Sequence, residues 1–439
     1  MKNFRCMTSG LTVNFKRSIS MPSKRRDFLL GGALAASALS TAKTNSANYF
    51  PPPDERGGWR TLDEPSRIRS VAGMDPAALD RAFEYTKTTS RFGGLLVARH
   101  GYLVYEKYFG RASREVTPNM ASCGKMFTSI CLGILMKEDP TLLPRGLSEK
   151  VFTPKYLPEA FPLSDARKAG IQLGHLLTMT SGMADGPGNP GIVHGEDIKI
   201  EGLAPVDPSL GQDMRALRGS MWTSPGGGYC YSSQGVHVAS IILRRLSGME
   251  MEEYIRRKLS TPMGFGGWGY AMQEANGKKL EHTPGGGGIT LRATDALRFG
   301  YMLLRNGYWG DKQVAPSEYL ALCRRPSAFN AHAPFSLQFE VNEDRHVASA
   351  PADAFFKSGA GGFCIYAVPS LDLAVYKMAC IGLTDSARYD LGYSGKTGNS
   401  DGSRDAWKPH PFDQFHDGPI NGDASTRRTL EMVIASIRE

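Results

Sequence analysis

The sequence is poor in the residues that define metal-binding and disulfide-rich proteins. It has seven cysteines and nine histidines in 439 residues. Six cysteines lie beyond residue 47, and they form neither a C-x-x-C pair nor a zinc-type spacing. We therefore expect small buried thiols in preference to disulfides. The histidines lack the i, i+4 spacing of metal ligands, so we expect no metal and no cofactor, and we interpret His175 as a core or capping residue.

Long apolar runs are also missing. Beyond the N-terminus no segment reaches the roughly 18 unbroken apolar residues of a membrane-spanning helix, which predicts a soluble mature protein without a stable membrane span. No repeat with a period of about 20 to 50 residues recurs, which excludes a repeat array. The hydrophobic fraction of 41% and charged fraction of 22% are ordinary for a globular protein large enough to bury a substantial core.

Basic charge is scarce outside the N-terminus. The formal net charge is +9, but residues 1–47 contain eight lysines and arginines against one aspartate, a net of +7. Residues 48–439 therefore carry only +2, the difference between these two values. Because residues 48–439 carry so little net positive charge, the composition argues against nucleic acid as a partner. Nothing in the sequence indicates an oligomeric state.

Residues 1–47 have the pattern of an export signal. The stretch SKRRDFLLGGALAASALSTA has a basic start, then an apolar run that ends in small residues. The pair Arg25-Arg26 is similar to a twin-arginine signal, with cleavage expected near Ala42 or Ala47. This interpretation predicts a periplasmic or secreted protein. The alternative is a disordered basic N-terminus on a cytosolic protein.

Strand patterns lie at both ends of the remaining chain, and helical patterns fill its middle. Residues 93–110 form two β-rich runs around a His100-Gly101 turn, and residues 361–381 form two more. Apolar residues recur at helical spacing between 121 and about 260. We predict an α+β fold for residues 48–439. In it an antiparallel sheet, flanked by N- and C-terminal helices, carries an inserted helical subdomain at about 121–283.

Shorter signals place individual helices. The segment 74–87 opens with Asp75 as N-cap and Pro76 at the first helical position. A second helix is expected over 294–307, with Thr294 as its cap. Gly182 and Gly248 are expected to end helices.

Three groups of residues carry candidate chemistry. The first is Ser122 with Lys125, one helical turn apart at the start of an apolar helix, where a buried amine could activate a hydroxyl. The second is the loop that contains Tyr231, whose phenol could relay a proton. The third is Lys357-Ser358-Gly359 before an apolar strand, where an amine and a hydroxyl would suit a substrate carboxylate.

In this order and spacing the three groups resemble the serine β-lactamase and penicillin-binding-protein-like hydrolases, in particular the class C β-lactamase, D-alanyl peptidase and esterase branch. The resemblance covers most of residues 74–383. It includes the blocks LLVARHGYLVYEKYFG, HLLTMTSGM, VASIILRRLSGMEMEEYI and GGGGITLRATDALRFGYMLLRNGYWG.

The resemblance implies a role for each site residue. Ser122 would be the acylated nucleophile and Lys125 its base or proton partner, although the identity of the base is disputed across the family. Tyr231 would protonate the leaving group, and Lys357 would anchor the substrate and tune Tyr231. The backbone N–H groups of Ser122 and Ala360 would form the oxyanion hole. The implied substrate-binding residues are Ser233, Ser358, Gly359 and Ala360.

Two positions depart from the family pattern. Residue 233 is serine where the family usually has asparagine, and a hydroxyl lacks the paired donor and acceptor of an amide. This weakens a β-lactam or peptide assignment more than it weakens hydrolysis itself. Met179 stands where many relatives have histidine.

Other matches carry less weight. Lys396-Thr397-Gly398 fits the Lys-Thr-Gly pattern more closely than residues 357–359 do, but no apolar strand follows it. The stretch 398–402, GNSDG, fits a nucleophile elbow without the buried strand that an elbow needs. The polar segment 384–424 is interpreted either as a cover over the cleft or as a surface excursion.

The sequence thus predicts an exported serine hydrolase that cleaves an amide or ester through a Ser122 acyl-enzyme. Its partner would be a small-molecule or peptide substrate. The class stays open among a β-lactam, a D-amino-acid peptide, a short acyl ester and an ω-amino-acid oligomer. The alternative is a non-catalytic cell-wall peptide or penicillin-binding protein of the same fold.

Overall fold

The computed structural model describes residues 49–90, 92–110, 112–186, 190–272, 279–379 and 422–438. The predicted export signal, the Lys-Thr-Gly match at 396–398, the GNSDG stretch and almost all of the segment 384–424 lie outside the described residues. Among the described residues, no helix is both long and apolar enough to cross a bilayer.

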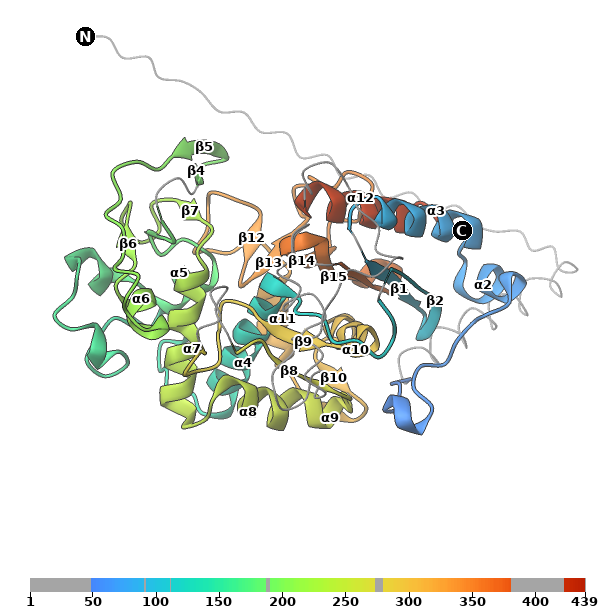
Figure 1. The fold of residues 1–439 in the computed structure, drawn as a ribbon, viewed down its shortest axis with the longest axis horizontal. Coiled ribbons are helices and arrows are strands. Elements are labelled where there is room, and N and C mark those ends of the chain that lie inside the picture. Colours follow the sequence, from blue (N-terminus) through green and yellow to red (C-terminus); the bar gives the residue numbers. More distant parts are fainter. Residues whose placement is uncertain are drawn as a thin grey trace, which may run out of the picture. The chain divides into compact units, whose positions relative to one another are not determined.

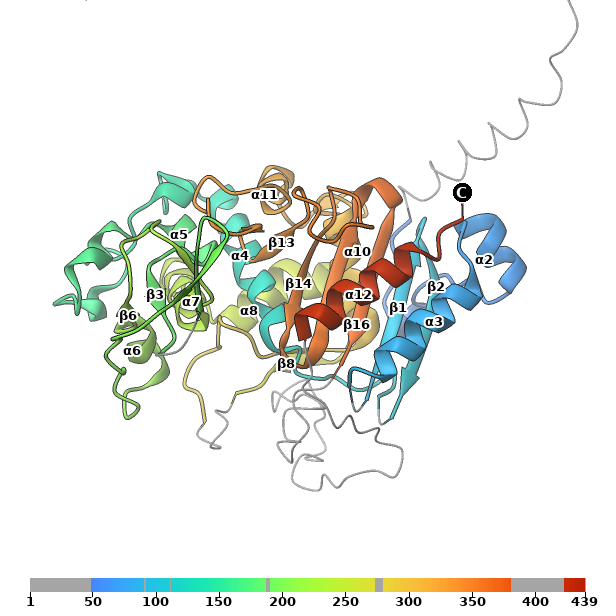
Figure 2. The ribbon, with the colours of Figure 1, turned by 90° about the horizontal axis from the view of Figure 1, so that it is seen from above.

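A seven-stranded antiparallel sheet joins strands from both ends of the chain (Figures 1 and 2). Its order is β12 (Phe335–Ser336), β13 (Phe339–Val341), β14 (Phe355–Gly359), β15 (Phe363–Val368), β16 (Leu373–Met378), β1 (Gly93–Arg99) and β2 (Tyr102–Phe109). The early strand β1 pairs with the late strand β16, with Gly94 opposite Met378. The two predicted strand pairs therefore belong to one sheet, as expected.

Helices cover both faces of this sheet. The predicted N-terminal and C-terminal helices, α3 (Pro76–Lys87) and α12 (Gly422–Ile434), lie side by side on one face (Figure 2). Helix α10 (Ala293–Leu304) packs against β15 and β16 from the other face. Each face has its own apolar core, because alternate residues of the buried strands point to opposite sides.

The middle of the chain forms the predicted helical region, which lies beside the sheet (Figure 1). Its helices are α4 (Gly124–Glu138), α5 (Leu173–Leu177), α6 (Gln212–Leu217), α7 (Ser233–Ser247), α8 (Met251–Ile255) and α9 (Thr261–Met263). Short strands accompany them, namely β3 (Met183–Ala184), β4 (Pro190–Val193), β5 (Glu196–Lys199), β6 (Ser220–Met221), β7 (Tyr229–Cys230), β8 (Trp268–Tyr270) and β9 (Ile289–Leu291). The remaining elements are α2 (Pro65–Ala72), α11 (Ser317–Cys323), β10 (Tyr308–Trp309) and β11 (Lys312–Gln313).

Several local expectations are confirmed. The Asp75 carboxylate accepts a hydrogen bond from the backbone of Ala77 and caps α3. Gly248 ends α7 with φ of 70°, a left-handed conformation that favours glycine. His175 accepts a hydrogen bond at Nδ1 from the backbone N–H of Gln172 and so caps α5. Five cysteines among the described residues are buried free thiols, at positions 123, 131, 230, 323 and 364.

Two local expectations are wrong. Thr294 does not cap α10, because the helix already begins at Ala293 with Arg292 at the N-cap position. The Thr294 hydroxyl donates to Asp54 in the N-terminal segment. Gly182 does not end α5, which stops at Leu177, five residues earlier. Gly182 has φ of 78° because it turns the chain against the backbone of Thr223.

Candidate active site

The candidate nucleophile lies in a 3₁₀ turn, Ala121–Cys123, that leads directly into α4. This turn places Ser122 one helical turn before Lys125, and Lys125 Nζ donates to Ser122 Oγ at 2.8 Å. Lys125 is fully buried, and its ammonium also donates to the carbonyl of Gly286. The structure therefore brings the predicted pair into direct contact, with the amine buried and the partly exposed Ser122 at the edge of the site.

The turn is held in an uncommon backbone conformation. Ala121 has φ of 49°, which is rare for a residue with a side chain. The side-chain carbonyl of Asn119 accepts a hydrogen bond from the Ala121 N–H at 2.9 Å. On the other side, a Cβ on Gly287 would lie 2.7 Å from the Ala121 carbonyl oxygen. These contacts fix the direction in which Ser122 presents its hydroxyl.

Tyr231 joins the pair from the loop between β7 and α7. Its phenol forms side-chain hydrogen bonds with both Ser122 and Lys125. Two ammonium groups flank its ring, with Lys125 Nζ 5.0 Å and Lys357 Nζ 5.2 Å from the ring centroid. All four residues predicted to be catalytic thus meet at one place, although they come from three separate parts of the chain.

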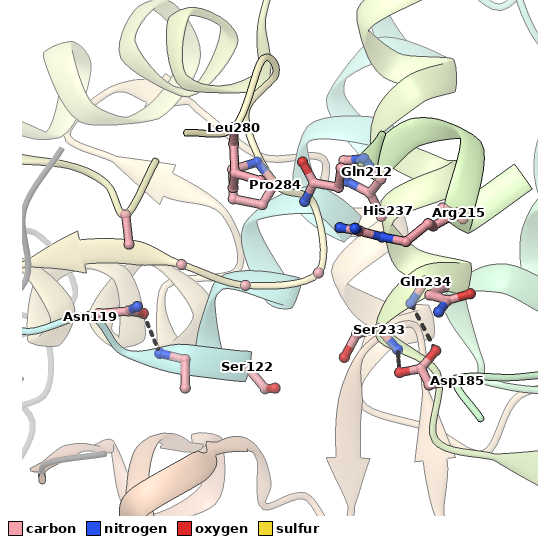
Figure 3. Close-up of a pocket in the computed structure, with 16 residues that line it drawn as sticks. Asn119, Ser122, Asp185, Gln212, Arg215, Ser233, Gln234, His237, Leu280 and Pro284 are labelled. Carbon is pink, nitrogen blue, oxygen red and sulfur yellow. Dashed lines mark hydrogen bonds between the residues drawn. The ribbon is translucent and has the colours of Figure 1, made fainter. Parts of the chain in front are cut away.

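Asp185 is a residue that sequence reasoning missed. Its carboxylate accepts hydrogen bonds from the Ser232 hydroxyl at 2.7 Å, the Ser233 N–H at 2.6 Å and the Gln234 N–H at 3.0 Å. Figure 3 shows the last two. These groups open α7 and directly follow Tyr231, so Asp185 holds the segment that carries the phenol. The only sequence signal was an acidic residue just after the Thr-Ser-Gly block, which does not reveal its distant partners.

The third predicted motif lies on β14 and the turn after it. Gly359 packs so closely that a Cβ there would lie 2.4 Å from the carbonyl oxygen of Met120, just ahead of the nucleophile turn. Alternation along the strand places Lys357 on the face toward Tyr231 and Ser358 on the opposite face. There the Ser358 hydroxyl donates to Glu340 at 3.2 Å. The exposed Ala360 begins the next turn.

The substrate-binding roles given to residues 358–360 stay predictions. Gly359 closely approaches the nucleophile turn, and the turn that begins at Ala360 also contacts it. The buried Lys357 ammonium donates to the carbonyl of Ser358 at 2.8 Å, which fixes it beside Tyr231.

Electrostatics distinguishes the three ionisable groups. Burial lowers the pKa of Lys125, and the nearby Tyr231 oxygen only partly offsets this. Burial alone would raise the pKa of Tyr231, but the charges of Lys125 and Lys357 outweigh it, and this pKa is lowered. Burial opposes the charge on Lys357, yet Tyr231 and Glu340 raise its pKa overall. Lys357 is therefore kept protonated, while the Lys125–Tyr231 pair is biased toward losing one proton and accepting another from Ser122.

A cavity of about 460 Å³ opens beside the nucleophile. Ser122 and the predicted substrate residue Ser233 face it from opposite sides (Figure 3). Its wall combines apolar residues with amides and one cation, namely Ala216, Ala271, Leu280, Pro284, Asn119, Gln212, Gln234 and Arg215. In Figure 3 the side chain of Gln234 extends away from Ser122. Among the described residues no cluster of histidine, cysteine, aspartate and glutamate could hold a metal ion.

The interleaved sheet, the inserted helices and the Ser–Lys–Tyr cluster define the class of serine β-lactamases and penicillin-binding proteins, as the motifs predicted. The Beta-lactamase family model matches residues 79–389, and the chain belongs to this family of hydrolases.

Individual relatives agree with this assignment. Esterase EstB from Burkholderia gladioli is 27% identical over 48% of this chain and 55% of its own length. Penicillin-binding protein 4* from Bacillus subtilis (strain 168) is 27% identical over 46% of this chain and 44% of its own. The chain thus spans about half the length of these curated relatives. Among solved structures, a putative 6-aminohexanoate-dimer hydrolase from Bacillus anthracis shares the fold, with a TM-score of 0.55 at 17% identity over 81% of this chain and 87% of that chain.

Proposed function

We propose that the protein is an exported serine hydrolase that cleaves an ester or amide through an acyl-enzyme on Ser122. The observation that carries this proposal is the contact of Ser122 with Lys125 and Tyr231 beside a cavity. A binding protein has no need of a buried amine on a serine hydroxyl, because such burial is costly unless it serves chemistry. The family and its esterase and penicillin-binding relatives support the same reaction class.

The reaction follows from the positions of the protons. Ser122 Oγ attacks the substrate carbonyl while its proton passes to the Lys125–Tyr231 pair, whichever of the two is unprotonated. The carbonyl oxygen becomes an oxyanion, which the backbone N–H groups of Ser122 and Ala360 would stabilise. Tyr231 then donates a proton to the leaving amine or alcohol as the bond to the carbonyl carbon breaks. In the second half, the same pair takes a proton from water as the water oxygen attacks the acyl-enzyme carbonyl. The bond between that carbon and Ser122 Oγ then breaks, the pair returns the proton to Ser122 Oγ, and the acid is released.

The cavity constrains the substrate. Its volume of about 460 Å³ suits an acyl group of moderate size, and its wall is partly apolar and partly amide. At position 233 the family usually has an asparagine, whose side-chain amide would bind a peptide-like acyl group. Ser233 provides only a short hydroxyl there, and this difference favours an ester or a simple amide over a β-lactam as substrate. Ester hydrolysis is therefore the activity to test first.

Two measurements test the chemistry. Wild-type protein and Ser122→Ala are incubated with a fluorophosphonate probe, and intact mass is recorded; we expect one adduct on the wild type and none on the variant. A panel of short p-nitrophenyl esters, nitrocefin and D-Ala-D-Ala peptides then reports the substrate class, with the esters turned over fastest. A folded wild-type protein that forms no adduct and turns over nothing in the panel would support the non-catalytic binder instead.

The export part of the proposal rests on the N-terminal sequence. In a host with a twin-arginine pathway, replacing Arg25 and Arg26 together by lysine should retain the protein in the cytoplasm. Fractionation and immunoblotting measure this, with the unmodified full chain as control. Equal fractionation of both proteins would contradict export by this route.

A further inference from the structure

A histidine in the cavity wall supports the loop that holds the catalytic lysine. His237 lies on α7 and is 3% exposed. It forms part of the cavity lining (Figure 3) and contacts Gly285 of the glycine-rich loop 284–288. No step of the proposed reaction uses it, yet both of its ring nitrogens are engaged.

The hydrogen bonds fix the tautomer of His237. Its Nδ1 accepts from the backbone N–H of Gly285 at 3.1 Å, so the proton lies on Nε2, which donates to Asp213 at 2.8 Å. Ser240 Oγ lies 3.3 Å from Nδ1, but it donates to the His237 carbonyl at 2.7 Å. Burial opposes the charge on Asp213, but hydrogen bonds from His237 and Arg244 outweigh it and lower the pKa of Asp213. The carboxylate therefore stays charged and keeps the ring in this orientation.

The loop connects this histidine to the reacting groups. The Gly285 N–H binds His237, and its carbonyl accepts from the Thr128 hydroxyl of α4 at 2.7 Å. The next carbonyl, that of Gly286, accepts from Lys125. Both polar groups of Gly285 are thus anchored immediately before the peptide that positions the catalytic amine.

Close packing makes the loop stiff. A Cβ on Gly285 would lie 2.3 Å from Ser240 Oγ, and one on Gly286 would lie 2.8 Å from the Ser233 carbonyl. Because Gly287 also presses on the turn before Ser122, the loop fills the space between α7 and the nucleophile turn. A shift of the loop at Gly285 is therefore transmitted to Lys125 and to the nucleophile turn.

We infer that His237 is a positioning residue, which uses Nδ1 to hold Gly285 and thereby sets the place of the Gly286 carbonyl and of Lys125. This inference rests on the proposed function, because it assigns His237 to the same acylation step. It gives a reason for a buried histidine, paired with a partly buried aspartate, beside a glycine-rich loop.

A pair of variants separates positioning from packing. His237→Asn keeps an acceptor near the place of Nδ1 and loses the bond to Asp213, whereas His237→Gln keeps a donor to Asp213 and loses the acceptor. We expect His237→Gln to lower kcat on p-nitrophenyl acetate by about 10- to 100-fold with KM within about twofold, since misplacement by about 1 Å costs roughly this much. His237→Asn should retain at least about a third of kcat although its melting temperature is the lower of the two. Thr128→Val, which removes the other anchor of Gly285, should resemble His237→Gln.

The outcomes are distinguishable. If kcat follows melting temperature, so that His237→Gln is the more active variant, His237 acts only through stability and the inference is overturned. If the wild type forms no fluorophosphonate adduct, the proposed function fails. A crystal structure of His237→Gln then decides the positioning claim by itself, because a Gly286 carbonyl still within hydrogen-bond distance of Lys125 Nζ overturns it.

Discussion

Removal of the Asp185 carboxylate tests how the phenol of the site is held in place. In Asp185→Ala the N–H groups of Ser233 and Gln234 lose an ionised acceptor at 2.6 and 3.0 Å. A hydrogen bond to a charged group contributes about 1.5–3 kcal/mol. Asp185 is only partly buried, and the Ser232 hydroxyl still caps the Gly235 N–H, so water replaces part of the loss. We expect the free energy of unfolding to fall by about 2–4 kcal/mol.

For a domain of this size that loss corresponds to a fall in melting temperature of about 3–5 °C. Urea titration followed by circular dichroism measures the free energy, and ester turnover measures kcat, which should fall because Tyr231 directly precedes the freed segment. Asp207→Ala is the matched control: the Asp207 carboxylate also accepts from a following serine, at 2.9 and 2.7 Å, but in an exposed loop. If both variants lose the same small amount of stability and activity, Asp185 does not organise the site.

Two further perturbations act on the same cluster. Lys357→Met removes a positive charge that lowers the pKa of Tyr231, so this pKa should rise and the acidic limb of the kcat/KM profile should move to higher pH. A limb that stays in place or moves to lower pH would contradict this assignment. Gly359→Ala forces a Cβ to within 2.4 Å of the Met120 carbonyl, and we expect kcat/KM to fall at least about tenfold. Gly211→Ala, where a Cβ meets no atom within 4 Å, should leave kcat/KM unchanged, and equal effects of the two substitutions would refute the steric argument.

The sequence predicted most of the architecture because its signals were local and periodic. The Asp75-Pro76 start of α3 and the His100-Gly101 turn between β1 and β2 each lie within a few residues of the structure they specify. Thr294 is the second residue of α10 and not its cap, and its hydroxyl binds Asp54, 240 residues earlier in the chain. Such tertiary contacts override local preference, and one sequence does not disclose them.

The residues of the candidate site likewise fall into those that the sequence predicted and those that it did not. The spacing of Ser122 and Lys125 was readable because a helical turn fixes their separation. Tyr231 and Lys357 were found through motif order, and the structure places them within reach of the pair. Asp185 and His237 escaped notice because their partners are backbone amides, which look the same at every position of a sequence.

The pairing of β1 with β16 also has a consequence for the order of events on the ribosome. Strand β1 leaves the exit tunnel long before its partner strand β16, which ends at Met378, has been synthesised. Until then β1 has unpaired backbone N–H and C=O groups along one edge of the β1–β2 hairpin. Such edges can pair with strands of other nascent chains. A chain stalled before β16 would therefore be an aggregation-prone intermediate. It would depend on chaperones until β16 has been translated and can pair with β1.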